Sequence, residues 1–256
     1  MQFDFGGQRV IVTGAAHGFG RAICQAFAEL GADVRACDIL VDELQETQVL
    51  VTNAGGRCRT RVVNVRERQQ VHDFVREVCS DGGPVQVLVN NAGGVLGQVG
   101  RPLEAVNEED WDSIFEVNAR GAFWMCQAVA PGMKQAHHGR IINISSGAGL
   151  RPSLTGIQAY AAAKAAQIHL TRQLAQELGP WGITVNTIAP GFVRSNPTTE
   201  RQWLAMGEEG QRNLVKGLAL RRLGSAGDIA KGALFFASEH AGWITGQVLS
   251  IDGGRL

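Results

Sequence analysis

Several features that mark whole classes of protein are missing from this sequence of 256 residues. No apolar run approaches the roughly 20 residues that a membrane-spanning helix needs. Lysine plus arginine and aspartate plus glutamate both number 24, so no net charge attracts nucleic acid or an anionic membrane. The opening stretch Met-Gln-Phe-Asp-Phe-Gly-Gly lacks the basic and apolar regions of a signal peptide. We therefore expect a cytoplasmic protein with neither a nucleic-acid nor a membrane partner.

The cysteines and histidines are also too scattered along the sequence to suggest disulfide bridges or a metal site. The five cysteines are odd in number and widely spaced, and no Cys-x-x-Cys occurs. We interpret them as small core residues in a reducing compartment. The six histidines offer no ligand cluster, and the adjacent His137 and His138 are expected to be solvated in a loop. The sequence therefore predicts no disulfide framework and no metal site.

Short apolar runs alternate with longer helical patterns along the chain. The runs are rich in Val and Ile without polar alternation, which is typical of parallel strands covered on both faces. The expected strands are 9–13, 33–37, 57–63, 85–89, 139–144, 183–188 and 247–251. The expected helices are 19–30, 42–54, 67–79, 108–133 and 158–178. This alternation predicts an α/β fold with one doubly wound, Rossmann-like sheet of seven parallel strands.

Nothing in the composition divides the chain, so we expect a single domain over residues 1–256. With 45% hydrophobic and 19% charged residues, a well-buried core is feasible. The stretch 192–217 differs, because it is polar, contains Pro197 and three glycines, and has only weak helical periodicity. A stretch of that length without firm structure is usually a functional lid or partly mobile. We expect it to be the lid over the substrate.

The sequence has a single tyrosine, and it lies four residues before a lysine. Tyr160 and Lys164 fall in a helical run, where residues at i and i+4 share a face with Cβ atoms roughly 5–6 Å apart. A nearby positive charge favours the phenolate over the phenol. The pair is therefore suited to exchanging a proton with an alcohol or carbonyl oxygen near neutral pH. A lone Tyr-x-x-x-Lys arises often by chance, so its meaning depends on the rest of the chain.

A glycine-rich turn follows the first expected strand and opens the first helix. Gly14, Gly18 and Gly20 have the spacing Gly-x-x-x-Gly-x-Gly, with His17 and Phe19 beside them. Such a turn brings backbone N–H groups and a helix N-terminus against a pyrophosphate. The alternative is a tight connection without a ligand. The strand before it and the helix after it favour the dinucleotide site.

Asp38 ends the second expected strand, eighteen residues beyond Gly20. A carboxylate there accepts hydrogen bonds from the adenosine ribose of NAD and repels the 2′-phosphate of NADP. His17 lies in the turn where a strongly basic residue could hold that phosphate, and a neutral imidazole does so poorly. We therefore expect NAD rather than NADP. The alternative is an acidic residue that merely starts a loop.

Further motifs follow in order along essentially the whole chain. They are Asn90-Asn91-Ala92-Gly93, Asn118, Ser145-Ser146, Tyr160-x-x-x-Lys164 and Pro190-Gly191. With the glycine pattern, they make the sequence resemble the classical short-chain dehydrogenase/reductase (SDR) family. The resemblance implies an oxidoreductase that moves a hydride between nicotinamide and a secondary alcohol or ketone, without a metal.

The resemblance also implies a role for each matching residue. Tyr160 is expected to be the general acid/base and Ser146 to orient the substrate oxygen. Lys164 is expected to lower the tyrosine pKa and to hold the nicotinamide ribose. Asn118 is expected to kink its helix and to hold a water between Lys164 and solvent. The expected cofactor-binding residues are Gly14, His17, Gly18, Phe19, Gly20, Asp38, Asn64, Val65, Asn91, Ala92, Gly93, Tyr160, Lys164, Pro190, Gly191, Val193 and Ser195.

Three positions depart from the family pattern. Asn64 stands where the family usually has an aspartate near adenine, and its amide oxygen can still accept that hydrogen bond. Ser146 precedes Tyr160 by fourteen residues, one more than in many members, which leaves Ser145 as a weaker candidate. Ser195 stands where threonine is common and keeps the hydroxyl.

Substrate specificity is expected to come from the loop after the fifth strand and from the lid. Both are rich in hydroxyl-binding groups and in guanidinium groups that pair with carboxylates. The candidate substrate-binding residues are Ser146, Arg151, Gln158, Tyr160, Asn196 and Arg201. We hypothesise catabolic oxidation of a polyhydroxylated substrate, a sugar or sugar acid, with Arg151 binding its carboxylate. The alternative is that these arginines face solvent.

Two other functions remain open from the sequence. A reductase of 3-oxoacyl carriers would share every motif, although Asp38 argues against its usual NADPH. A nucleotide-binding regulatory protein without catalysis is a remoter alternative. The segment 243–254 resembles the final strand and tetramer-forming edge of the family, and 229–236 has an apolar helix face that can pack between subunits. The alternative is that both segments are core. We expect a homotetramer, with a dimer as the second choice.

Overall fold

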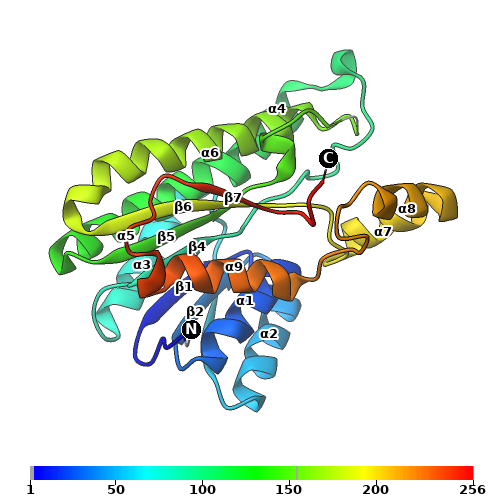
Figure 1. Ribbon diagram of the computed structural model, residues 1–256. Coiled ribbons are helices and arrows are strands. Elements are labelled where there is room, and N and C mark those ends of the chain that lie inside the picture. The colour runs from blue at the N-terminus through cyan, green and yellow to red at the C-terminus, as the bar shows by residue number, and fades with distance from the viewer. Residues whose placement is uncertain (1–2, 154, 256) are drawn as a thin grey trace.

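The computed structural model describes residues 3–153 and 155–255 (Figure 1). Seven strands form one parallel sheet in the order β3-β2-β1-β4-β5-β6-β7. They are β1 (Arg9–Thr13), β2 (Asp33–Asp38), β3 (Arg57–Val62), β4 (Val87–Asn90), β5 (Gly139–Ile144), β6 (Ile183–Pro190) and β7 (Val248–Ile251). The predicted seven-stranded, Rossmann-like sheet is confirmed. Residues 1–2, 154 and 256 of the expected domain lie outside the described residues.

Helices cover both faces of this sheet. They are α1 (Gly18–Glu29), α2 (Val41–Asn53), α3 (Arg68–Ser80), α4 (Glu108–Phe115), α5 (Gly121–Ala136), α6 (Gln158–Leu178), α7 (Pro197–Ala205), α8 (Gly207–Lys216) and α9 (Ala226–Ala237). Short turns are η1 (Leu103–Ala105), η2 (Glu116–Arg120), η3 (Gly147–Gly149), η4 (Gly179–Trp181) and η5 (Glu239–Ala241). Side chains of α1, α2 and α9 pack on one face, and those of α3, α5 and α6 on the other.

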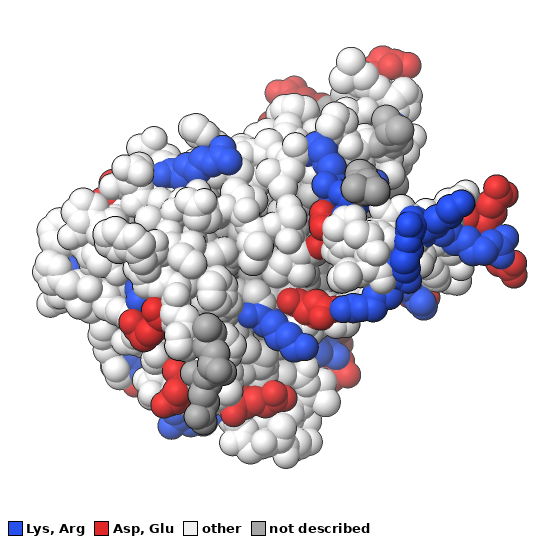
Figure 2. Space-filling view, in the orientation of Figure 1, with Lys and Arg blue, Asp and Glu red and all other residues white. Residues whose placement is uncertain are grey.

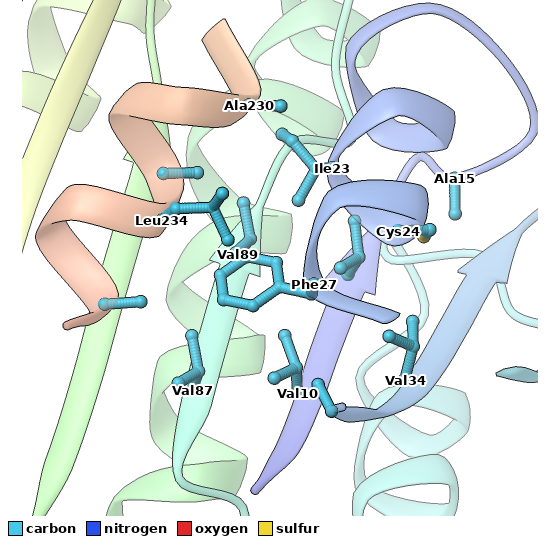
Figure 3. Close-up of a cluster of buried hydrophobic side chains, with 14 of the residues drawn as sticks. Val10, Ala15, Ile23, Cys24, Phe27, Val34, Val87, Val89, Ala230 and Leu234 are labelled. Atoms are coloured by element: carbon cyan, nitrogen blue, oxygen red, sulfur yellow. The ribbon is translucent and has the colours of Figure 1, made fainter. Parts of the chain in front are cut away.

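The sheet core explains why the central strands β1 and β4 are buried along their whole length, whereas the edge strand β3 alternates arginines with smaller residues. Along β1, Val10 belongs to the cluster under α1 and α9, whereas Ile11 belongs to the cluster on the other face. Figure 3 shows Phe27 of α1 and Leu234 of α9 meeting over the strands in the first cluster. Burying each such side chain contributes about 1.5–3 kcal/mol. Alternation of polar and apolar residues would place polar groups in one of these clusters.

The helix expected over 108–133 is interrupted. It begins at Glu108, capped by Asn107, and ends at Ala136, but the π turn η2 separates α4 from α5. The Asn118 side chain donates 2.8 Å to the carbonyl oxygen of Ile114, four residues earlier. This takes an acceptor that the helix backbone uses in regular α geometry, which accounts for the local change of winding.

The expectation of little regular structure in 192–217 is wrong, because α7 and α8 lie there. Asn196 and Thr199 form a capping box at the start of α7, with Pro197 in the first turn. Met206 separates the two helices, and Gly207, the first residue of α8, has φ +61°. The Arg194 guanidinium, in the segment that leaves β6, lies 5.3 Å from the ring centre of Trp203 in α7.

Charged side chains of both signs are spread over the visible surface, including the projecting α7 and α8 (Figure 2). Exposed ion pairs such as Arg194–Glu200 and Arg212–Glu208 account for part of this mixture. Across residues 3–153 and 155–255, no helix combines the length and the apolar character needed to cross a membrane.

The five cysteines are free thiols, and all except the half-buried Cys79 are buried. Burial raises the pKa of the Cys58 and Cys126 thiols to about 12. These side chains pack as small apolar groups in the core.

Candidate active site

The predicted site residues come together at the carboxyl edge of the sheet. Asp38 ends β2, Asn91 follows β4, Ser146 follows β5 and Pro190 ends β6. Because all the strands are parallel, the segments that follow them meet at this edge. The projecting helices α7 and α8 follow β6 there (Figure 1).

The glycine turn is locked against the loop after β4. A Cβ on Gly20 would lie 2.0 Å from the carbonyl oxygen of Gly14, and one on Gly14 would lie 2.7 Å from Cα of Ala92. Gly14 also has φ +64°. The Asn91 side chain donates 2.8 Å to the Gly14 oxygen and 3.1 Å to that of Thr13. Neither glycine has room for a side chain.

The N-terminus of α1 fits an anionic group. His17 is the N-cap residue, but its side chain makes no capping hydrogen bond, and the first turn holds no acidic residue. By contrast, side chains cap α4, α7 and α9. The first N–H groups of α1 are therefore free of side-chain acceptors within the described residues. A diphosphate suits these donors and the positive end of the helix dipole.

Asp38 braces this turn and keeps capacity for a ligand. One carboxylate oxygen accepts a hydrogen bond of 3.0 Å from the Ala16 N–H, and the other accepts hydrogen bonds from the N–H groups of Ile39 and Leu40. A carboxylate has about four acceptor positions, so one remains for a ribose hydroxyl. The geometry is consistent with the expected ribose contact.

Two residues that the sequence did not single out support the turn from behind. The buried Thr47 hydroxyl lies 2.9 Å from the Ala15 oxygen, and the Arg21 guanidinium donates 2.6 Å to the Ala16 oxygen. Both lie in helices, where their spacing resembles that of any amphipathic segment. Only the tertiary contact identifies their role.

The remaining predicted cofactor residues also follow the carboxyl ends of the strands. Asn64 accepts 3.1 Å from the N–H of Arg66 in a local turn, which engages its amide oxygen. Val65 packs so closely on α5 that a Cβ on Gly121 would lie 2.8 Å from it. Ser195 lies against the glycine turn, since its backbone oxygen would be 2.9 Å from a Cβ on Gly18. The predicted positions, which also include Phe19, Gly93, Gly191 and Val193, stay predictions for cofactor binding.

The two candidate serines have different surroundings. The Ser145 hydroxyl is buried and donates 3.0 Å to the backbone oxygen of Lys164. Ser146 is half-buried, accepts a hydrogen bond of 3.1 Å from the Ala148 N–H, and is close enough to Tyr160 to lower the pKa of the phenol. Ser146 is thus beside the phenol, whereas Ser145 anchors α6.

Lys164 is enclosed between α6, β5 and the loop after β4. The residue is 3% exposed, and its ammonium group donates a hydrogen bond of 2.8 Å to the Ile144 oxygen. It lies 5.7 Å from the ring centre of Tyr160. It also lies beside Gly93, where a Cβ would be 3.2 Å from the nitrogen. The expected proximity of the lysine and the tyrosine is therefore present.

Asn118 holds the same loop in place. Its amide oxygen accepts 3.0 Å from the Gly94 N–H, and its amide nitrogen donates 2.9 Å to the Gly94 oxygen. It is fully buried and lies in the π turn that separates α4 from α5.

Electrostatics at the pair differ from the expectation. Burial raises the Tyr160 pKa above its ordinary value, and the nearby Ser146 hydroxyl opposes this only in part. Burial also lowers the Lys164 pKa to about 7. A lysine that is only partly charged near neutral pH cannot strongly favour phenolate. The expected lowering of the tyrosine pKa is therefore not found in the protein alone.

The candidate substrate residues are less uniformly placed. Arg151 pairs with Asp252 at 2.6 Å and donates to the Arg255 oxygen at 3.3 Å. Gln158 starts α6 and donates 3.0 Å to the Arg101 oxygen. Asn196 caps α7, and Arg201 is exposed and contacts Thr198 of its own helix. The last two side chains are thus engaged within α7.

Comparisons with known proteins agree with this arrangement. The chain matches the short chain dehydrogenase family over residues 8–204. It is 37% identical to the 3-oxoacyl-(acyl-carrier-protein) reductase of Thermotoga maritima, over 98% of both chains. It is 39% identical to the "probable galactose dehydrogenase" of Rhizobium meliloti, over 98% of this chain and 96% of that one. The solved structure of levodione reductase superposes with a TM-score of 0.91 at 28% identity, over 98% of both chains. The protein therefore belongs to the short-chain dehydrogenase family, oxidoreductases that act on alcohol and carbonyl groups.

Proposed function

We propose that the protein is an NAD-dependent dehydrogenase that oxidises a secondary alcohol of a sugar or sugar acid. The observation that carries this is the placement of unpaired polar atoms. Among the described residues, four buried side-chain atoms without a hydrogen-bond partner lie in the loops after β4 and β5 or at the start of α6. They are Oε1 and Nε2 of Gln98, Nε of Arg151 and Oε1 of Gln158.

Such atoms favour a polar ligand. A buried polar group without a partner costs free energy, and a ligand that supplies the missing hydrogen bonds recovers it. A substrate with several hydroxyls or a carboxylate can do so, whereas a purely apolar one leaves these groups unpaired. The substrate of the relative named for galactose is consistent with this class.

The protein side chains would divide the reaction as follows. Ser146 donates to or accepts from the substrate oxygen, and Tyr160 exchanges a proton with it through its phenol oxygen. Lys164 lies behind the tyrosine and holds the ribose hydroxyls. Bound nicotinamide supplies the hydride acceptor. The raised Tyr160 pKa keeps the phenol protonated at neutral pH, so oxidation requires its prior deprotonation.

NAD is favoured over NADP by the end of β2. If the adenosine ribose binds at the end of β2, a 2′-phosphate would meet the Asp38 carboxylate. The next two residues, Ile39 and Leu40, are exposed and uncharged. No cation of this segment would offset the repulsion between carboxylate and phosphate.

Arg151 stays our candidate for a substrate carboxylate. Two of its nitrogens are engaged with Asp252 and Arg255, but its buried Nε has no partner within the described residues. If Arg151→Ala left the KM of an acidic substrate unchanged, this assignment would be wrong. A neutral sugar oxidised by the same enzyme is the control, because its KM should be unaffected.

A reductase of 3-oxoacyl carriers is the second candidate. It is favoured by exposed leucines on the segments beyond the carboxyl edge, Leu96, Leu103, Leu150 and Leu204. These could contact an acyl chain. The Thermotoga maritima relative is a reductase of this kind by name.

NADH formation on a panel of substrates separates the candidates. The purified protein would be tested with NAD and with NADP on sugars, aldonic acids, 3-deoxy sugar acids and simple secondary alcohols, and in reverse on 3-oxoacyl thioesters. Activity with NAD on sugars or sugar acids supports the proposal. Turnover of thioesters alone, with NADPH, would overturn it. A non-catalytic regulatory protein would turn over none of them.

We further propose that the protein is a cytoplasmic homotetramer. The edge strand β7 is the expected contact, and Trp243, five residues before β7, is fully exposed. The apolar face of α9 is not available for it, because Ile229, Ala233 and Phe236 are buried in the core of this chain. Light scattering should give about four times the chain mass of 27.4 kDa. A mass of one or two chains would contradict the tetramer.

A further inference from the structure

The loop between β4 and α4 is held at two points close to α6, the helix that carries Tyr160. At one end, Gly94 is fixed to Asn118 by two hydrogen bonds of 3.0 and 2.9 Å. At the other end, the Gly100 N–H donates 2.8 Å to the Thr155 oxygen, and Arg101 accepts from Gln158. Residues 94–100 therefore connect a point fixed to Asn118 with a point fixed to the segment just before Tyr160.

Along this loop a polar side chain is buried and apolar side chains are exposed. Gln98 is completely buried, whereas its neighbours Leu96 and Val99 are 54% and 39% exposed. The hydrophobic effect alone would bury the leucine and valine and expose the glutamine. Some requirement other than packing therefore places the carboxamide inside.

The protein itself does not satisfy that carboxamide. Neither Oε1 nor Nε2 of Gln98 has a hydrogen-bond partner within the described residues. Buried side-chain polar atoms without a partner are uncommon, and each needs an explanation. Gln158, which donates to Arg101 at the end of this loop, repeats the pattern in part, because its Nε2 is bonded and its Oε1 is not.

The backbone of the loop is shaped for adjustment rather than close packing. Leu96 has φ +45° and Gly97 has φ +87°, and a Cβ on Gly94, Gly97 or Gly100 would meet nothing within 4 Å. Such a loop can shift slightly to admit a ligand group without breaking packed contacts.

We propose that Gln98 is a specificity-determining residue, whose carboxamide binds two neighbouring hydroxyls of a polyhydroxylated substrate. Oε1 accepts from one hydroxyl and Nε2 donates to the other, which is the pairing that an amide offers to a diol. This inference rests on the proposed oxidation of a sugar or sugar acid. It adds a residue on the β4 side of the site to the predicted ones on the β5 side.

Gln98→Leu tests the proposal, using the full-length protein with NAD. The substrates are the best sugar or sugar acid of the panel and its analogue lacking one hydroxyl next to the reacting carbon. We expect kcat/KM to fall about ten- to hundredfold for the full substrate and less than about threefold for the deoxy analogue. Gln98→Asn, which keeps the amide on a shorter stem, should lie between.

Thermal unfolding of the unliganded protein distinguishes recognition from a structural role. Because leucine replaces an unpaired amide, Gln98→Leu should unfold at the same or a higher temperature. Gln8→Leu is the matched control, since Gln8 also has a buried unpaired Oε1 but lies just before β1, at the opposite edge of the sheet. It should not alter the ratio between the two substrates.

Each result decides the matter. Equal losses on both substrates together with a lower unfolding temperature would mean a structural glutamine and overturn the proposal, as would unchanged kinetics. A wild-type protein that oxidises no sugar or sugar acid with either cofactor would refute the proposed function itself, and this inference with it.

Discussion

The cofactor side of this site, around the glycine turn, and its substrate side, on the loops near Tyr160, differ in how their buried polar groups are hydrogen-bonded. Around the glycine turn, the protein pairs them with one another: Asp38 accepts three N–H groups, and Thr47 and Arg21 reach the turn carbonyls. On the loops near Tyr160, Gln98 and Gln158 keep unpaired amide atoms.

The difference shows which interactions folding completes and which it leaves for a ligand. A turn that must present N–H groups to a diphosphate gains from being rigid before the ligand arrives. A pocket that must distinguish one alcohol from another gains from groups that are satisfied only by the right substrate. We expect substitutions on the two sides to have different consequences.

The largest effect is expected at the boundary between the two sides. Tyr160→Phe removes the proton-exchanging oxygen but keeps the ring, so kcat should fall by about 10²–10⁴-fold. NADH binding, followed by its fluorescence, should stay close to that of the wild type because the glycine turn is untouched. A variant that kept more than a tenth of the wild-type rate would contradict the acid/base role. Loss of NADH binding would show that the two sides are not independent.

Rigidity can be compared with a matched pair of glycine substitutions. Gly20→Ala would force a methyl group to within 2.0 Å of a backbone oxygen, and we expect a loss of about 3 kcal/mol in the free energy of unfolding. Gly97→Ala meets no atom within 4 Å and suffers only its φ of +87°, which costs about 1 kcal/mol. Urea unfolding measures both values. Equal losses would remove the contrast between the two sides.

The lowered pKa of Lys164 determines the sign with which the free energy of unfolding should depend on pH. The folded protein releases this proton near pH 7, whereas an unfolded lysine keeps it until about 10.5. Between these values the unfolded chain binds more protons, so the free energy of unfolding should rise with pH. The buried charge therefore costs stability below pH 7, and the cost disappears as pH increases.

The measurement compares wild type with Lys164→Met by urea unfolding at pH 6.5 and 9.5. The buried thiols act in the opposite direction at high pH, because their pKa values are raised, but they cancel in the difference between the two proteins. The wild type should gain on the order of a few kcal/mol relative to the variant. Parallel pH profiles would mean that the ammonium is better solvated than its burial indicates.

A smaller effect is expected for cofactor choice. Asp38→Asn keeps an amide oxygen for the Ala16 N–H and removes the charge that faces a 2′-phosphate. The kcat/KM ratio of NADP to NAD should rise about ten- to hundredfold. Asp42→Asn, an exposed carboxylate in the first turn of α2, is the control and should not change the ratio. An unchanged ratio in Asp38→Asn would place the discrimination elsewhere.

The smallest effect is expected on the outside of the projecting helices. Arg194 and Glu200 form an exposed pair whose charges are largely screened by water. Arg194→Ala should therefore shift the unfolding temperature by no more than about 1 °C. A larger loss, measured by calorimetry, would indicate that the contact of Arg194 with Trp203 holds α7 in place.

Local patterns were sufficient for most of the sheet. The strand expected over 9–13 begins and ends as predicted, because its Val and Ile side chains are buried on both faces and a glycine turn ends it. The helix of Tyr160 was also located correctly, from Gln158 to Leu178. The capping residues Asn196 and Thr199 were a local signal for α7 that the weak apolar periodicity obscured.

Other features depend on contacts between distant segments. The π turn arises where Asn118 binds both Gly94 and Ile114, and the first of these lies twenty-four residues away. The direction of the Tyr160 pKa reflects the packing around the phenol, whereas the sequence shows only its spacing from Lys164. Spacing places charges near each other, but burial decides whether they are charged.

The sequence by itself thus determined the fold class, the order of the motifs and the Tyr160–Lys164 pairing, because these follow from periodicity and from residue types at fixed spacing. Tertiary structure decided which polar groups are satisfied. The sequence singled out Asp38 but not Gln98, and it could not show that Asp38 accepts three N–H groups or that Gln98 is enclosed without a partner within the described residues. Hydrogen bonding in a buried site depends on which donors and acceptors the fold brings within about 3 Å of each other, and local sequence does not determine this.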